Sequence, residues 1–342
     1  MKPPLLSSLL PQEIADALDL EPYRGRQIFR WIHQKGVQDL ADMSDLPKEL
    51  RQRAAHQVRI EPLETVQLAE SQRSAGTRKA VFRLADGETV ESVLIRDRDR
   101  ATLCLSSQVG CAVKCSFCAT GLSGYKRNLA PGEIAAQASA MLAGVDLDGR
   151  KPNIVYMGMG EPFRNYGAVM KSAELLMDPN GLNIGQRRIT ISTVGEVNGV
   201  RRFAHEPWQV RLSVSLHAAN DALRSVLVPL NRKYPLAELR ESIEYYILAS
   251  GRQITFEWTL LEGVNDLPEH AKELAEFMDG LKATVNLIPY NPVEELDYKA
   301  PSRKRCEAFR DMLARKGVTA TLRRERGQDI SAACGQLRRQ TA

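Results

Sequence analysis

The sequence predicts an α/β protein built on a partial (β/α)6-type barrel, with a small helical N-terminal accessory domain and a β-hairpin that leads into the barrel. Three observations predict this architecture. Short apolar runs rich in β-branched residues recur between residues 153 and 325, with helical patterns between several of them. Residues 5–57 show helical periodicity, and an Asp86-Gly87 pair separates two further strand-like runs. The length of 342 residues allows one large domain or two unequal ones.

The first element is helical. Apolar side chains recur at helical spacing, among them Ile14, Leu18, Ile28 and Trp31. The segments EPYRG and LPKE carry turn signals within this region. Residues 1–58 are therefore predicted to form the helical accessory domain.

The second element is a β-hairpin. In TRKAVFRLADGETVESVLIRD, two strand-like runs flank Asp86-Gly87, which is a strong short-range hairpin signal. Residues 59–96 are therefore predicted to be the lead-in to the barrel.

Residues 97–342 are predicted to form the barrel core. Helical patterns at residues 131–142 and 167–177 separate strand-like runs, as in a parallel sheet that wraps into a barrel. About six such units are present, fewer than the eight of a closed barrel. The strand-like runs cover residues 153–158, 187–193, 211–217, 252–261, 284–291 and 318–325.

Composition and charge narrow the class of protein. Hydrophobic residues make up 43% and charged residues 26%, and no apolar run approaches the roughly 18 residues of a membrane span. The first residues lack a signal-peptide pattern, so we expect a cytoplasmic protein without membrane association. The formal net charge is +5, and residues 303–339 alone carry eleven Lys or Arg against four acidic residues. This basic stretch suggests a polyanionic partner.

Three of the six cysteines lie close together, in GCAVKCSFCATG. Thiols this close in a cytoplasmic protein are typical metal ligands. A structural zinc site normally has four protein ligands, and only His205 or His217 could complete one here. Three thiolates at CxxxCxxC spacing suit instead a 4Fe–4S cluster whose fourth iron stays open to a small ligand. The predicted cluster ligands are Cys111, Cys115 and Cys118.

The cysteine motif, with Phe117 before its last cysteine, resembles the signature of the radical SAM superfamily. The resemblance implies a radical SAM barrel in which the cluster and S-adenosylmethionine (SAM) generate a 5′-deoxyadenosyl radical. It also implies that Gly160 and Glu161, in NIVYMGMGEP, bind the methionyl amino group of SAM. A third glycine is missing at Phe163, so this segment is not a Rossmann fingerprint.

Polar residues at the carboxyl ends of barrel strands usually build the site. They predict Ser192, Ser215, His217 and Asn291 as further cofactor-binding residues. The apolar Leu216, between Ser215 and His217, is predicted to bind the cofactor with them.

The chain as a whole resembles the radical SAM adenosine C2 methyltransferases, which modify 23S ribosomal RNA and certain tRNAs. The matching segments run from residue 100 to residue 337 and include MGMGEP, SLHAANDALR, NLIPYNP and DISAACGQL. The N-terminal module resembles the accessory domain of the family, which implies a contact with RNA. The resemblance also implies an electron donor such as flavodoxin with its reductase, and we expect a monomer.

The same resemblance implies three catalytic residues and two SAM molecules per methylation. One SAM methylates Cys334, and a second supplies the radical that activates the S-methyl group for addition to C2 of adenine. Glu91 would take the C2 proton. Cys104 would form a disulfide with Cys334 as the adduct breaks. Without the resemblance, Cys104 is interpreted as an apolar strand residue and Glu91 as a solvated carboxylate.

The sequence leaves three other classes of protein open. A related methyltransferase attacks C8 of the same ribosomal adenosine with the same two cysteines. A radical SAM activase or peptide-modifying enzyme would share the cluster loop but not the cysteine pair, and a zinc-stabilised RNA-binding protein would contain no iron. No role is assigned to Cys306, Met157 or Met159.

Overall fold

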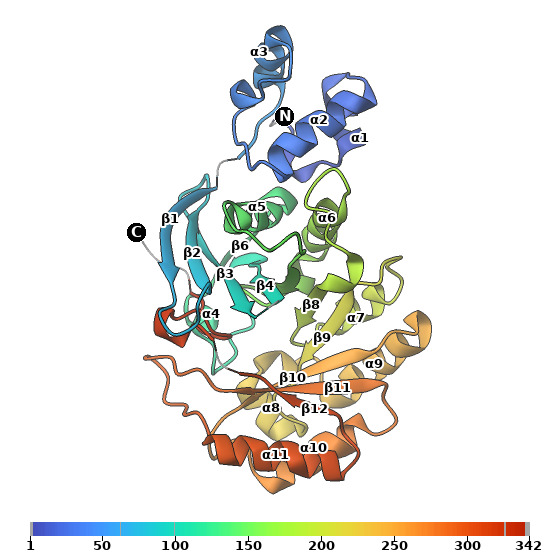
Figure 1. Ribbon diagram of the computed structural model, residues 1–342. Coiled ribbons are helices and arrows are strands. Elements are labelled where there is room, and N and C mark those ends of the chain that lie inside the picture. Colours follow the sequence, from blue (N-terminus) through green and yellow to red (C-terminus); the bar gives the residue numbers. More distant parts are fainter. Residues whose placement is uncertain (1–2, 62, 99, 325, 339–342) are drawn as a thin grey trace.

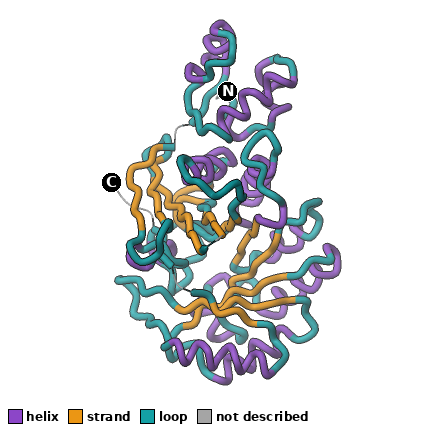
Figure 2. Tube along the Cα trace, in the orientation of Figure 1, coloured by secondary structure: helices purple, strands orange, loops and turns teal. Residues whose placement is uncertain are grey.

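The computed structural model describes residues 3–61, 63–98, 100–324 and 326–338. Ten strands form one sheet in the order β1-β2-β3-β4-β7-β8-β9-β10-β11-β12. The strands from β4 onward run parallel and curve around an interior, with helices along the outer side (Figures 1 and 2). The parallel strands are β4 (Arg100–Cys104), β7 (Asn153–Tyr156), β8 (Ile189–Thr193), β9 (Arg211–Ser215), β10 (Ile254–Leu260), β11 (Ala283–Pro289) and β12 (Ala320–Leu322).

This arrangement confirms the predicted partial barrel. Each of the six predicted strand-like runs overlaps one of the strands β7 to β12, and β11 begins one residue before its run, at Ala283. Strand β4 adds a parallel strand in front of them. The connecting helices are α5 (Pro131–Leu142), α6 (Tyr166–Met177), α7 (Val197–Phe203), α8 (Asp221–Leu227), α9 (Leu236–Ser250), α10 (Pro268–Met278) and α11 (Arg303–Arg315). In the described part of the chain, no helix is both long enough and apolar enough to cross a membrane.

Three antiparallel strands extend the sheet beyond β4. The predicted hairpin is β2 (Arg78–Arg83) and β3 (Thr89–Asp97), and its turn places Gly87 at a φ of 83°, which favours glycine. The third strand, β1 (Glu64–Glu70), was not singled out from the sequence. Most of its side chains are exposed, so it lacks the alternation that marks a half-buried strand.

The N-terminal module consists of helices that pack against the outer side of the barrel (Figure 1). Ser139 Oγ on α5 donates to the carbonyl of His33, and Gln34 donates to the carbonyl of Gly181. These bonds fix the end of α2 against the barrel. The elements of the module are η1 (Leu6–Ser8), α1 (Pro11–Leu18), α2 (Pro22–His33), η2 (Leu40–Asp42) and α3 (Lys48–Gln57).

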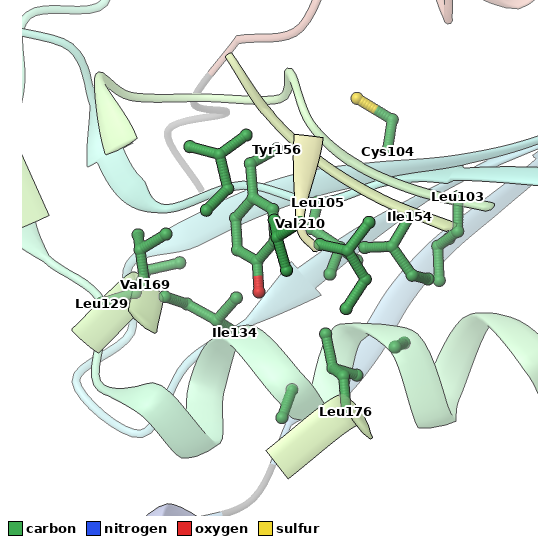
Figure 3. Packing of buried hydrophobic residues seen from close by; sticks show 14 of the residues in the cluster. Leu103, Cys104, Leu105, Leu129, Ile134, Ile154, Tyr156, Val169, Leu176 and Val210 are labelled. Atoms are coloured by element: carbon green, nitrogen blue, oxygen red, sulfur yellow. The ribbon is translucent and has the colours of Figure 1, made fainter. Parts of the chain in front are cut away.

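The hydrophobic core lies between the sheet and the helices. Leu103 and Leu105 point toward α5 and α6, whereas the sulfur of Cys104 points to the other side of the strand (Figure 3). This alternation follows from the pleat of a β-strand. It separates a packed outer face from an inner face that is free to carry reactive groups.

The cysteine loop follows β5 (Gln108–Gly110) and precedes α4 (Ala119–Leu122), and a second short strand, β6 (Tyr125–Asn128), pairs with β5. A Cβ on Gly110 would lie 1.6 Å from the carbonyl oxygen of Gly124, so only glycine fits where these strands meet.

The last described residues, 327–338, form what we call the C-terminal segment, which includes η6 (Gln328–Ile330). Lys79 Nζ on β2 donates to the carbonyl of Ser331, and the carbonyl of Gly335 accepts from the amide of Ala119. The segment therefore bridges the antiparallel extension and the cysteine loop.

Candidate active site

One cavity lies at the carboxyl ends of the parallel strands, beside the cysteine loop. Nine of the predicted site residues line it together. They come from five separate parts of the chain, which the parallel sheet brings to one edge. These residues are Cys111, Cys115, Cys118, Gly160, Glu161, Ser192, Ser215, His217 and Cys334.

The three loop cysteines are half-buried. Burial raises the pKa of the Cys111 thiol to about 12, and burial also raises the pKa of Cys115 well above its usual value. Negative charge on neighbouring cysteines and on Glu161 raises both pKa values further. Three thiolates in this loop therefore require a strongly cationic partner.

Glu161 follows β7 and ties two strand ends together. Its carboxylate accepts hydrogen bonds from the amides of Phe163 and Val194, at 3.0 and 2.9 Å. Burial raises the pKa of this carboxyl group to about 7 despite these bonds. Gly160 beside it has a φ of 105°, and a Cβ there would lie 2.6 Å from Gln108, so the position requires glycine.

The ends of β8 and β9 supply hydroxyl and imidazole groups. Ser192 Oγ and Ser215 Oγ lie 3.4 Å apart. His217 Nδ1 accepts from the amide of Thr259, and the ring packs edge-on against Phe117 with centroids 4.7 Å apart. Burial lowers the pKa of His217 to about 3, so the ring is neutral at physiological pH.

Two predicted cofactor-binding residues do not line this cavity. The Leu216 side chain is fully buried, and its backbone bonds to Glu257 and Arg224. Asn291 Nδ2 donates to the carbonyl of Cys334 at 3.3 Å, and its oxygen accepts from Gln328. Asn291 therefore holds the C-terminal segment, and a cofactor contact for either residue stays a prediction.

A second, smaller cavity adjoins the first, and Cys334 lines both. Cys104 and Arg323 also line this smaller cavity. Burial raises the pKa of Cys104 to about 12, the nearby Cys334 raises it further, and the positive charge of Arg323 opposes this. The structure thus brings together the two cysteines that the sequence resemblance pairs, next to a guanidinium group.

Glu91 lies outside both cavities, on β3. Its side chain is fully buried and lies 3.2 Å from Lys79 Nζ, and its second oxygen accepts from the amide of Arg338 at 3.1 Å. The interpretation as a solvated carboxylate is therefore wrong. In this structure Glu91 contacts the C-terminal segment at Arg338.

Two site residues were missed from the sequence. Glu257 on β10 is buried and lines the main cavity, where one oxygen accepts from Ser213 and Asn286 and the other has no partner among the described residues. Glu257 is the charged residue inside the apolar run ITFEWTL, and this pattern could have indicated a site residue in the sequence. Arg323 carried no such signal, because it follows a three-residue strand in a stretch rich in arginine.

Comparisons with known proteins agree with this geometry. The family model of the radical SAM superfamily matches residues 105–278, and that of the ribosomal RNA large subunit methyltransferase N-terminal domain matches residues 12–60. A dual-specificity RNA methyltransferase RlmN from Anaeromyxobacter dehalogenans is 47% identical over 96% of this chain and 90% of its own. A probable RlmN from Geobacillus kaustophilus is 45% identical over 98% and 93%. The crystal structure of a radical SAM methyltransferase from Sphaerobacter thermophilus is 47% identical, with a TM-score of 0.93 over 98% and 99% of the two chains.

The half-open parallel barrel, with three cysteines at its mouth, defines a radical SAM enzyme. At this level of identity over nearly the whole chain, the protein belongs to the RlmN family of dual-specificity RNA methyltransferases.

Radical SAM enzymes use a 4Fe–4S cluster and SAM, and the residues present fit both. Within the described ranges, no three His, Cys, Asp or Glu side chains converge on one point as ligands of a single metal ion. A cluster does not need such convergence, because each cysteine binds a different iron. Glu161, buried at the cavity wall, offers a carboxylate to a cationic group such as the SAM ammonium.

Proposed function

We propose that this protein methylates C2 of specific adenosines in 23S ribosomal RNA and tRNA, with an S-methyl group on Cys334 as the intermediate. The observation that carries the proposal is that Cys334 lines both cavities. The loop cysteines and Glu161 also line the first of these cavities, and Cys104 also lines the second. The proposal also includes two SAM molecules per turnover, a flavodoxin-type electron donor, a monomeric state and a cytoplasmic location.

C2 of adenine is electron-poor, so a direct displacement of the SAM methyl group by this carbon is chemically implausible. When bound, the cluster and SAM supply a 5′-deoxyadenosyl radical that can remove a hydrogen atom. The chain holds the carbon from which this hydrogen is removed, as a methyl group on Cys334. Cys334, as a thiolate, attacks the methyl carbon of a first SAM, and the bond from that carbon to the SAM sulfur breaks.

Cys334 then holds the methyl carbon at the main cavity. Loss of one hydrogen from this carbon allows it to bond to C2, which joins the RNA to Cys334 through a methylene bridge. Glu91 takes the proton from C2, and the one electron left in excess would return to the cluster. Cys104, as a thiolate, attacks the Cys334 sulfur, so the bridge leaves with the RNA, takes up a proton to become a methyl group, and leaves a disulfide.

The positions of Glu91 and Arg323 affect these reaction steps. Both oxygens of Glu91 are engaged, one by Lys79 and the other by the amide of Arg338. Glu91 can therefore act as a base only after residue 338 moves away. Arg323 places a positive charge beside both thiols and so stabilises whichever of them is ionised.

The test uses SAM with a deuterated methyl group and anaerobically reconstituted enzyme. Without RNA, mass spectrometry is expected to show a trideuteromethyl group on the peptide that contains Cys334. With tRNA or 23S RNA transcripts, digestion to nucleosides is expected to give 2-methyladenosine whose methyl group holds two deuterium atoms and one hydrogen. Methylation only at C8, or an unlabelled Cys334 in enzyme with an intact cluster, would overturn the proposal.

A further inference from the structure

A basic cavity of about 450 Å³ lies at the end of the barrel opposite the active site. Arg100 and Arg211 begin β4 and β9, and Arg188 directly precedes β8. The active site lies at the other ends of these strands. Arg188 directly precedes β8 and Ser192 lies near its end, and this separation of four residues corresponds to about 13 Å of extended chain. The cavity is therefore a separate feature of the molecule.

Seven of the eleven lining residues are cations and one, Asp148, is acidic. Within the described residues, no carboxylate forms an ion pair with Arg98, Arg100, Arg188 or Arg211. Asp99, the acidic residue between Arg98 and Arg100 in the sequence, lies outside the described residues. Converging cations without carboxylate partners create a strong positive potential.

The basic stretch at residues 303–339 is different. Five of its arginines form ion pairs with carboxylates, which reduces the positive potential available to a partner there. These pairs are Arg303–Glu307, Arg305–Asp266, Arg310–Asp311, Arg326–Asp97 and Arg338–Glu295. The prediction that this stretch contacts a polyanion stays a prediction.

The basic cavity adjoins the accessory domain. Lys151, which lines the cavity, donates to the carbonyl of Leu182 at 2.8 Å. The neighbouring carbonyl of Gly181 accepts from Gln34 at the end of α2, and Arg30 on α2 contacts Asn180. One loop, residues 178–185, thus links both surfaces. A single extended polyanion can reach the two together.

We propose that this cavity is a second RNA contact, which binds phosphates of the substrate RNA at a distance from the target adenosine. Guanidinium groups bind phosphates through paired, charge-assisted hydrogen bonds, and several converging arginines match the repeated charge of a nucleic-acid backbone. A redox protein has to approach the cluster, and this cavity is at the far end of the barrel. The inference rests on the proposed function for its choice of RNA as the polyanion.

The test compares two variants with the same change in charge. In one, Arg98, Arg100, Arg188 and Arg211 are each changed to Gln. In the control, Arg303, Lys304, Arg310 and Arg315 on α11 are each changed to Gln. The probes are a full-length tRNA transcript and the isolated stem-loop that contains the target adenosine. Affinity is measured against salt concentration, and methylation of Cys334 without RNA checks that each variant is folded and active.

For full-length tRNA, the cavity variant is expected to bind more weakly, and its plot of log affinity against log salt is expected to flatten by about 3, as for four lost phosphate contacts. Its affinity for the stem-loop is expected to equal that of the wild type, and the control variant is expected to bind both RNAs normally. Wild-type affinity of the cavity variant for tRNA would overturn the proposal, as would equal losses in the control variant or on the stem-loop.

Slower reduction by flavodoxin with unchanged RNA binding would overturn the proposal in favour of a protein partner. If the two variants show the expected binding pattern but the wild-type enzyme methylates neither RNA, the proposed function fails and the RNA contact stands.

Discussion

Cys104 and Cys334 line the same small cavity, although one ends the first parallel strand and the other follows the last. Arg323 lies beside both, and the charges of Cys334, Glu257 and Cys104 raise its pKa, so the guanidinium stays positive. A thiol pair with a permanent cation is suited to disulfide formation, because the attacking group must be a thiolate.

Replacement of Cys334 by Ala is expected to abolish both the S-methyl group and the methylation of RNA, because no other described thiol lines both cavities. Labelled SAM and mass spectrometry of protein and RNA measure the two losses. Cys306→Ala is the matched control, since Cys306 is buried on α11 beside Pro301. Continued RNA methylation by Cys334→Ala would contradict the intermediate.

Replacement of Cys104 by Ala is expected to leave S-methylation of Cys334 intact and to trap RNA on the protein, because the second thiol that releases it is missing. A denaturing gel with labelled RNA measures the trapped species, and nuclease digestion should leave an adenosine adduct on the Cys334 peptide. Normal turnover without an adduct would show that Cys104 is dispensable.

Replacement of Glu91 by Gln is expected to trap the same adduct, since the proton on C2 is not removed. The change also leaves the nearly buried Lys79 without its carboxylate, and breaking a buried ion pair typically costs about 3–5 kcal/mol of stability. Folding is therefore checked by S-methylation of Cys334 in the absence of RNA. A folded variant that turns over normally would exclude Glu91 as the base.

Replacement of Arg323 by Gln is expected to slow the alkylation of Cys104 by iodoacetamide at pH 8 by about tenfold, because the charge of Arg323 lowers the pKa of this thiol. Arg323→Lys should restore most of the rate. Arg324→Gln, which changes the exposed neighbour, should leave it unchanged. Equal rates in all four proteins would mean that Arg323 has no electrostatic effect on this thiol.

His33 gives a prediction about pH. Burial between α2 and the barrel lowers the pKa of this histidine from 6.5 to about 4. Its contribution to stability is therefore fully present above pH 6.5 and is lost as the pH falls toward 4, by about 2 kcal/mol at pH 5. Denaturant unfolding at pH 7.5 and pH 5 measures the loss, which His33→Phe should reduce. An equal loss in this variant would assign the acid sensitivity to other groups.

The sequence predicted the residues whose positions follow from local pattern. Three cysteines within one loop must lie together, and polar residues at the ends of parallel strands must meet at one edge, as Ser192, Ser215 and His217 do. The Asp86-Gly87 turn was likewise readable, because its geometry depends on neighbouring residues.

The features that escaped prediction depend on contacts between distant parts of the chain. Strand β1 has no buried face to mark it, and it forms because β2 offers a paired edge. The cations of the basic cavity come from four separate segments of the chain, so no local run of charged residues indicates the cavity in the sequence. The position of Arg323 depends on where a three-residue strand, β12, joins the sheet.

Arg224 shows how the mouth of the barrel is held. This buried guanidinium donates to the carbonyls of Leu216 and Val194 and to the side chain of Asn231, so it bonds the loops after β8 and β9 and the turn after α8. These loops share one anchor, which couples their movements to one another. A radical formed between them is thus enclosed by walls with little independent motion, which limits the directions in which it can react with the enzyme itself.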